Sequence, residues 1–191
     1  MPPKAKFTRE DIIAAALGEI EKNGEESFTA RTLAAALNSS TRPIFTVFDG
    51  MDEIKKEVIA AASKIYDGYV SEGLKQTPAF KGVGTAYIRF AAERPKLFML
   101  LFMREQSGAP SVDSVLPVID GSADTILQSV ISAYGVERDI AHKLYLHSWI
   151  YTHGIAVLTA TKVCRFSADD VSGMLTDVFS ALLTKYKRGE I

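Results

Sequence analysis

Apolar side chains recur along most of the chain at intervals of three and four residues, which is the spacing of one face of an α-helix. In the first such segment Ile13, Leu17 and Ile20 share a face, while Glu10 and Glu19 point outward. No stretch alternates apolar and polar residues as a half-buried β-strand does. The pattern predicts an all-α protein with about nine helices, over residues 8–23, 30–37, 41–48, 52–73, 82–93, 95–105, 113–134, 137–162 and 168–187.

Residues that begin and end helices support these boundaries. Thr8 is a candidate N-cap with Asp11 three places on, and Ser167 with Asp170 repeats the pattern at the last helix. Gly24 follows the first helix directly, in the position where glycine ends helices. The first and last helices are therefore the best bounded.

Residues 28–48 predict two short helices, 30–37 and 41–48, with a polar break between them. Helices of this length are unstable alone, so they must pack on each other and on the first helix. Leu33 and Ile44 supply apolar contacts for that packing. The arrangement predicts a helix-turn-helix, whose second helix presents its first residues to the major groove of DNA.

Candidate DNA-contacting residues lie on and around these two helices. Arg42 is the one long hydrogen-bond donor of the second helix, and its fork suits a guanine edge, worth about 1–3 kcal/mol in discrimination. Arg31 begins the preceding helix, and Arg9 belongs to a basic N-terminal arm that suits phosphate or the minor groove. Predicted contacts of the arm and the two helices are Lys4, Lys6, Arg31, Ser40, Thr41, Arg42 and Thr46.

The charge of this region leaves an alternative open. The chain of 191 residues has a net charge of −1, and residues 1–60 hold eight Lys and Arg against ten Asp and Glu, a net of −2. DNA-binding regions are usually basic, so acids such as Glu19, Glu21, Glu25 and Glu26 must lie away from the groove. The alternative is a helical small-molecule-binding or protein-interaction module that does not bind DNA.

The stretch from Phe7 to about Glu57 carries a distinctive set of motifs: Ile12-Ile13-Ala14-Ala15-Ala16-Leu17, Gly24, Phe28-Thr29-Ala30-Arg31, and Thr41-Arg42-Pro43-Ile44-Phe45 leading to Phe48. It resembles the DNA-binding domain of the tetracycline-repressor (TetR/AcrR) family of transcriptional regulators. The resemblance implies a helix-turn-helix DNA-binding domain at 1–50 and a helical effector-binding and dimerisation domain at 51–191. It also places Pro43 and Phe45 among the DNA contacts.

The chain departs from the family pattern at three positions. Members often carry tyrosine where Phe45 stands, histidine at Val47, and a phosphate-binding lysine at Met51. The phosphate anchor must then come from Lys55, from Lys56, from backbone amides, or from nothing.

Large apolar side chains gather in the C-terminal part of the chain. They suit either an ordinary bundle core or a ligand pocket between helices. Trp149 and His153 are four apart on one helix, so their side chains are neighbours and can offer a stacking plane and a donor. The resemblance implies a small-molecule effector here, and the predicted ligand-binding residues are Tyr87, Phe90, Phe98, Phe102, Trp149 and His153.

The last two predicted helices, 137–162 and 168–187, have broad apolar faces. We expect them to pair with their copies about a two-fold axis, which makes a homodimer that reads a palindromic operator. The first stripe is Ile150, Gly154, Val157, Leu158 and Thr161, and the second is Val171, Leu175, Val178, Phe179, Leu182 and Leu183.

Other chemistry has little support in the sequence. His142, His147 and His153 lack the four-residue spacing of a helical metal pair, and Cys164 is the single cysteine. Gly82-Val-Gly84 begins like a nucleotide-binding turn but lacks its third glycine. We expect a cytoplasmic protein with no enzymatic activity, cofactor, metal or membrane segment. The residues and the family resemblance together predict a repressor that a small-molecule effector releases from double-stranded operator DNA, and an activator is the alternative.

Overall fold

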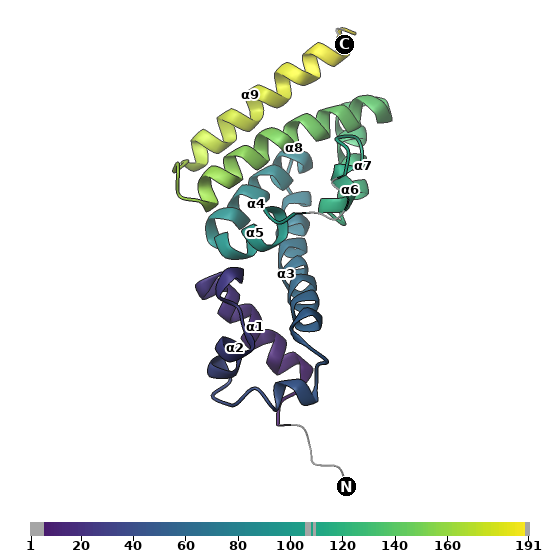
Figure 1. The fold of residues 1–191 in the computed structure, drawn as a ribbon. Helices are drawn as coiled ribbons and strands as arrows, with labels where there is room; N and C mark the ends of the chain where they lie inside the picture. Colours follow the sequence, from purple (N-terminus) through teal and green to yellow (C-terminus); the bar gives the residue numbers. More distant parts are fainter. Residues whose placement is uncertain (1–5, 106–107, 109, 190–191) are drawn as a thin grey trace. The chain divides into compact units, whose positions relative to one another are not determined.

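The structure is a computed structural model that describes residues 6–105, 108 and 110–189. Within these ranges it contains nine α-helices, two 3₁₀ turns and no β-strand (Figure 1). The α-helices are α1 (Arg9–Asn23), α2 (Ala30–Ala36), α3 (Met51–Leu74), α4 (Ala79–Glu93), α5 (Pro95–Phe102), α6 (Val115–Ile119), α7 (Ala123–Tyr134), α8 (Arg138–Ala160) and α9 (Ala168–Lys187). The 3₁₀ turns are η1 (Glu25–Ser27) and η2 (Ile44–Thr46).

The predicted ends of the best-bounded helices are confirmed. The Thr8 hydroxyl accepts the backbone N–H of Asp11 at 3.1 Å, and the Asp11 carboxylate accepts the N–H of Thr8 at 2.9 Å. Ser167 and Asp170 form the same reciprocal pair at the start of α9. Gly24 ends α1 at a φ of 86°, a conformation that side chains rarely adopt.

The helix predicted over 41–48 is wrong, because this segment forms turns and the short 3₁₀ element η2. Proline restricts the segment at position 43, and the Thr46 hydroxyl donates to the Pro43 carbonyl oxygen at 2.7 Å. Such a local bond competes with an α-helical ladder. The backbone N–H of Ile44 bonds the carbonyl of Thr41 at 3.1 Å, which is 3₁₀ spacing.

The single helix predicted over 113–134 is also wrong. Two helices, α6 and α7, occupy this stretch and are separated by Asp120, Gly121 and Ser122. The Asp120 carboxylate accepts the backbone N–H of Ser122 at 2.8 Å, which forms a local turn. The predicted number of helices, nine, nevertheless agrees with the described residues. The helix expected over 41–48 is absent, and the one expected over 113–134 is two helices.

The chain forms two compact units, and the division falls inside α3. Unit 1 comprises the residues up to Ile65 together with Lys96–Arg104, and unit 2 comprises Tyr66–Pro95 and the residues from Glu105 onward. The core of unit 1 includes the buried side chains Ile12, Leu33, Ile44, Phe48 and Leu97. In unit 2, α4 packs most extensively on α8, which also contacts α7 and α9. None of the described helices is both long and apolar enough to cross a membrane.

Candidate functional site

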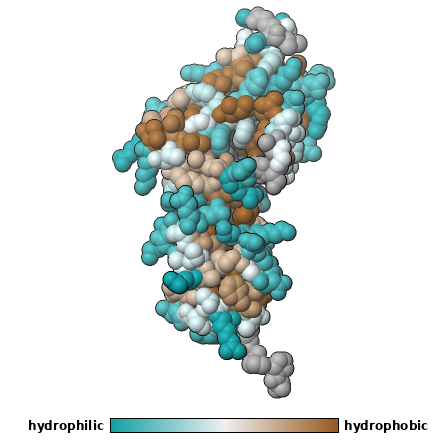
Figure 2. Space-filling view, in the orientation of Figure 1, coloured by the Kyte–Doolittle hydropathy of each residue, from teal (hydrophilic) through white to brown (hydrophobic). Residues whose placement is uncertain are grey.

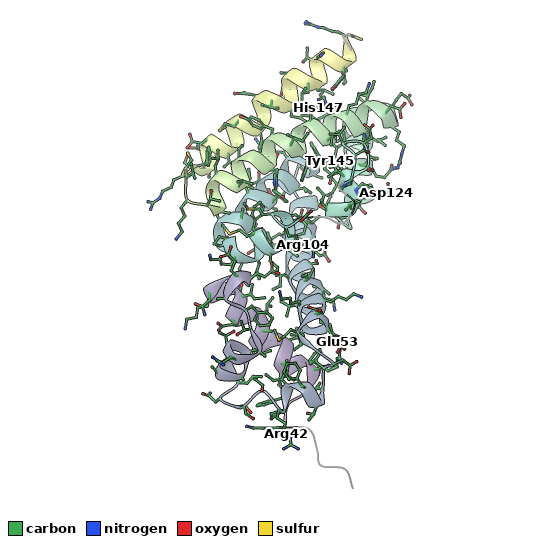
Figure 3. The ribbon with its side chains drawn as sticks, in the orientation of Figure 1. Arg42, Glu53, Arg104, Asp124, Tyr145 and His147 are labelled. Atoms are coloured by element: carbon green, nitrogen blue, oxygen red, sulfur yellow. The ribbon has the colours of Figure 1, made fainter. Side chains whose placement is uncertain are left out.

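The segment between α2 and α3 has buried apolar side chains that anchor it and polar side chains that are exposed to solvent. Ile44 and Phe48 are buried in unit 1 and fix the turn. Ser40, Arg42, Phe45 and Thr46 are exposed, and Thr41 and Pro43 are half-buried. Figure 3 shows Arg42 directed away from the body of unit 1. The structure therefore brings six of the predicted DNA contacts together on one exposed turn.

Two arginines of this region have no hydrogen-bond or ion-pair partner among the described residues. They are Arg42 on the turn and Arg31 at the start of α2, and both are exposed. Exposed guanidinium groups are available to phosphate oxygens or base edges. Arg31 and Arg42 are thus arginines that unit 1 leaves free beside its helix-turn-helix segment, and Lys56 is likewise exposed without a partner among the described residues.

Other predicted basic contacts are engaged. The Lys6 ammonium donates to the Ser39 hydroxyl at 3.1 Å and lies 5.1 Å from the Phe7 ring centre. The Lys55 ammonium lies 3.8 Å from a carboxylate oxygen of Glu25. Both contacts are solvent-exposed and weak enough to exchange for phosphate. Lys4 lies outside the described residues.

Arg9, expected in a loose arm, is instead a structural residue of unit 1. Its guanidinium donates to the Val47 carbonyl oxygen at 3.1 Å and to the Glu53 carboxylate at 2.6 Å, and it also bonds Glu57. It lies 4.1 Å above the centre of the Phe48 ring. The carboxylates of Glu53 and then Glu57 raise the pKa of Arg9 above its usual value. Arg9 therefore holds the end of the exposed turn against α1 and α3.

Glu53 completes this connection. Its carboxylate also accepts the backbone N–H of Asp49 at 2.8 Å, and hydrogen bonds from Arg9 and then Asp49 lower the pKa of Glu53. Arg9 and Glu53 are 44 positions apart in the chain. The only sequence signal was a pair of acids, Glu53 and Glu57, spaced by four residues on the helix after the turn.

This network makes a prediction that separates structural from phosphate-binding basic residues. Arg9→Ala should weaken binding to a duplex selected by the wild-type protein from a random-sequence pool, because the turn loses its support. The slope of log affinity against log salt should not change, since that slope counts phosphate contacts. Arg31→Ala should reduce the slope by about one. Fluorescence anisotropy between low and moderate salt measures both, and a reduced slope for Arg9→Ala would place this residue on the DNA instead.

Unit 2 contains a partly open cavity of about 220 Å³ between α4, α7, α8, α9 and the end of α3. Its walls are mostly apolar and aromatic, and neighbouring rings contact one another. The centre of the Phe80 ring lies 5.6 Å from that of Tyr145 and 5.3 Å from that of Phe179. The apolar and aromatic side chains of the wall include Phe80, Val83, Tyr134, Trp149, Leu175, Phe179 and Leu183.

Polar groups occupy one part of the cavity wall. The Tyr66 hydroxyl donates to the Asp120 carboxylate at 2.9 Å, and both side chains are buried. Burial raises the pKa of Asp120 against the lowering effect of hydrogen bonds from Ser122 and Tyr66. Burial also raises the pKa of Tyr66, Tyr87 and Tyr145, so these hydroxyls stay protonated at neutral pH. The wall thus combines neutral phenols with one carboxyl group.

Two of the predicted ligand-binding residues, Tyr87 and Trp149, line this cavity. His153 is not a lining residue, but its Nδ1 lies 2.9 Å from the Tyr87 hydroxyl and its ring stacks on Trp149 with centres 5.2 Å apart. Phe90 is buried outside the lining of the cavity. Phe98 and Phe102 belong to α5 in unit 1, where their ring centres lie 5.4 Å apart.

Sequence reasoning missed most of the polar lining. Tyr66 comes from the long helix after the DNA-binding motif, Asp120 from the unpredicted break between α6 and α7, and Ser148 from the helix interior. The only available signal for Ser148 was its position beside Trp149. Asp120 was placed within a continuous helix, where a carboxylate normally faces solvent.

An exposed apolar surface lies over α8 and α9, where brown side chains gather in Figure 2. Ile150 is 49% exposed and Leu158 is 38% exposed, and a side chain added at Gly154 would meet no atom within 4 Å.

The apolar stripe predicted on α9 does not lie on a single surface. Val171 is buried in unit 2 and Leu175, Phe179 and Leu183 line the cavity, whereas Val178 and Leu182 are half-buried.

Nothing in the described part of the chain gathers three or more His, Cys, Asp or Glu side chains as a metal site would. His147 and His153 bond different tyrosines, Tyr186 and Tyr87. Their contacts are those of structural histidines.

Comparisons with known proteins agree with this architecture. Residues 80–184 match the family described as tetracyclin repressor-like, C-terminal domain. An uncharacterized HTH-type transcriptional regulator of Mycobacterium tuberculosis is 25% identical over 187 residues, which cover 96% of this chain and 84% of the relative.

Solved structures show the same fold. A TetR-like transcriptional regulator from Rhodococcus sp. RHA1 superposes with a TM-score of 0.62 at 13% identity, over 99% of this chain and 100% of that one. The fatty acid degradation regulator of Bacillus halodurans gives a TM-score of 0.61 at 15% identity, over 94% and 97% of the two chains. Since the family match covers more than half of its residues, the chain belongs to the TetR family of DNA-binding, helix-turn-helix transcriptional regulators.

Proposed function

We propose that the protein is a homodimeric transcriptional repressor that a small-molecule effector releases from a palindromic operator. The observation that carries the proposal is the cavity of about 220 Å³ in unit 2, most of whose lining residues belong to the region that matches the family's C-terminal domain. An apolar cavity between helices is where helical bundles hold ligands. The exposed turn with Arg42, supported from beneath by Ile44 and Phe48, is the DNA-reading surface of the same chain.

Helix α3 is the element through which we propose the two activities are coupled. Its first turn carries Glu53, which binds Arg9 beside the DNA-reading turn, and its later part carries Tyr66, which lines the cavity. An effector that binds better when α3 has shifted favours that conformer over the DNA-binding one. A 100-fold loss of operator affinity requires a difference of about 2.7 kcal/mol in effector affinity between the two conformers.

Arg42→Ala tests the DNA-reading surface. The operator is first obtained as a duplex that the wild-type protein selects from a random-sequence pool. The variant should bind this duplex at least about 30-fold more weakly, because a two-point contact with a guanine is worth about 1–3 kcal/mol and the proposed dimer loses two of them. A second selection with the variant should show relaxed preference at one base pair of each half-site.

Arg165→Ala is the matched control, because Arg165 is an exposed arginine between α8 and α9. It should keep the wild-type affinity and preference. An Arg42→Ala protein that selects the same sequence as the wild type would remove Arg42 from base recognition. Transcription in vitro from a promoter that overlaps the selected duplex then tests repression, which an increase in transcript on adding protein would contradict.

A further inference from the structure

We propose that the cavity of unit 2 takes protonated amines with a compact apolar body, and that Asp120 is the residue that recognises the ammonium group. The inference rests on the proposed effector role of the cavity and names the chemical class of ligand that the cavity selects. Its support is the set of polar groups that unit 2 places in an otherwise apolar space.

Asp120 is a buried carboxyl group with no basic partner. It is 7% exposed and lines the cavity, and its two oxygens accept the Tyr66 hydroxyl and the Ser122 N–H. No Lys, Arg or His of the described residues forms an ion pair with it. Burying a carboxylate without a cation is unfavourable, and a cationic ligand in the cavity offsets that cost.

Two cations lie on or near the cavity, and each of them bonds a group other than Asp120. The Lys81 ammonium lies on the lining but donates to the Ser172 and Thr176 hydroxyls, both at 2.8 Å. Arg138 shares a neighbouring pocket with Asp120 and donates to the Asp124 carboxylate at 2.9 Å. Neither cation neutralises Asp120, so a ligand carboxylate placed beside Asp120 would meet like charge.

Aromatic faces around Asp120 also suit a cation. Tyr66, Tyr87 and Tyr145 all line the cavity, and the ring centres of Tyr66 and Tyr87 lie 5.8 Å apart at an angle of 82°. The ring faces of tyrosines attract an ammonium group, most strongly where water is excluded. Three phenol rings and one carboxyl group are the components of a cation-binding site.

Ser148 supplies an independent observation that points to a ligand. Its side chain is 8% exposed and lines the cavity, and its hydroxyl oxygen has no hydrogen-bond partner. Buried polar atoms are rarely left unsatisfied in native proteins. An ammonium group carries three N–H donors, and a buried hydroxyl oxygen such as that of Ser148 is an acceptor for one of them.

The test uses three adamantane compounds of nearly equal shape: 1-adamantylamine, 1-adamantanol and 1-adamantanecarboxylate. Trp149 is the single tryptophan of the chain and lines the cavity, so its fluorescence reports binding. The amine should bind the wild-type protein at least tenfold more tightly than the alcohol, and the carboxylate more weakly than either. This comparison needs no variant and therefore does not depend on whether a variant folds.

Asp120→Asn assigns the preference to one residue. It keeps the size of the side chain and removes its charge, so the amine should bind no more tightly than the alcohol. Asp177→Asn is the matched control, because Asp177 is an exposed carboxylate of α9 that does not line the cavity and should leave the preference unchanged. Equal binding of amine and alcohol by the wild type, a preference for the carboxylate, or no response from Trp149 would overturn the inference.

Operator release separates this inference from the proposed function. If the amine binds through Asp120 and the selected duplex stays bound, the ligand class stands and the release mechanism fails. If the alcohol or the carboxylate binds best and releases the duplex, the repressor mechanism stands and the amine class is wrong.

Discussion

Gly82→Ala is expected to destabilise the protein by roughly 3 kcal/mol or more, the upper part of the range for overpacking a tight contact. A Cβ added at Gly82 would lie 2.2 Å from the carbonyl oxygen of Gly73 and 2.8 Å from the Cβ of Gln76. Both atoms belong to or adjoin the backbone, so no side-chain rotation relieves the clash. In the reverse direction a Cβ at Gly73 would lie 2.8 Å from the backbone of Gly82. The backbones of α3 and α4 therefore touch at this pair of glycines.

Urea denaturation followed by circular dichroism measures the effect, with Gly68→Ala as the matched control. Gly68 lies on the exposed side of α3, and a Cβ there would meet no atom within 4 Å. Since alanine favours a helix over glycine, Gly68→Ala should stabilise the protein by about 0.5–1 kcal/mol. Replacing glycine by alanine is thus expected to stabilise the protein at Gly68 and to destabilise it at Gly82, although both positions belong to unit 2. A Gly82→Ala protein as stable as the wild type would show that α3 and α4 do not touch here.

This contact explains a sequence pattern that resembled something else. Gly82-Val-Gly84 has the spacing of a nucleotide-binding turn, yet both glycines lie inside α4. Gly82 allows the approach of α3, and a Cβ at Gly84 would lie 3.3 Å from the Leu175 side chain on α9. The spacing of these glycines reflects helix packing, which a sequence motif cannot distinguish from a backbone that approaches phosphate.

Local features were the most predictable from the sequence. Capping by Thr8 and Ser167 depends on residues three positions apart, so it could be read directly. The 41–48 segment failed because its apolar residues fit a helical period, while Pro43 and the Thr46 hydroxyl favour a tighter turn. Ser40, Arg42 and Thr46 are nevertheless exposed as predicted, because 3₁₀ and α geometry differ little over one turn, whereas Thr41 is half-buried.

Features that depend on distant residues could not be predicted in this way. Tyr66 and Asp120 are 54 positions apart, and Arg9 and Glu57 are 48 apart. A single sequence carries no signal for such pairs. The apolar period of α9 likewise predicted one stripe, although Leu175 faces the cavity and Val178 does not line it. Periodicity shows that a helix has an apolar face and does not show what covers each part of that face.

Ile150→Glu is expected to convert the proposed homodimer into a monomer of 20.8 kDa. Ile150 is 49% exposed in the single chain, and Leu158, two turns along the same face of α8, is 38% exposed. Gly154 between them leaves the helix backbone accessible to a second helix. In a two-fold interface each substitution occurs twice, so two carboxylates would be desolvated close to one another. Ultracentrifugation measures the mass directly.

The same variant should lose operator affinity by at least 100-fold, equivalent to about 2.7 kcal/mol, because a monomer contacts one half-site of the palindrome. Val163→Glu is the matched control: Val163 is 73% exposed in the connection between α8 and α9, so the same charge there should leave dimer and affinity unchanged. Circular dichroism must show wild-type helix content in both variants, which separates loss of the dimer from loss of the fold. If Ile150→Glu remains dimeric and binds the selected duplex as tightly as the wild type, the subunits meet through another surface. Loss of DNA binding without loss of the dimer would instead connect this face of α8 to the conformation of the DNA-reading turn.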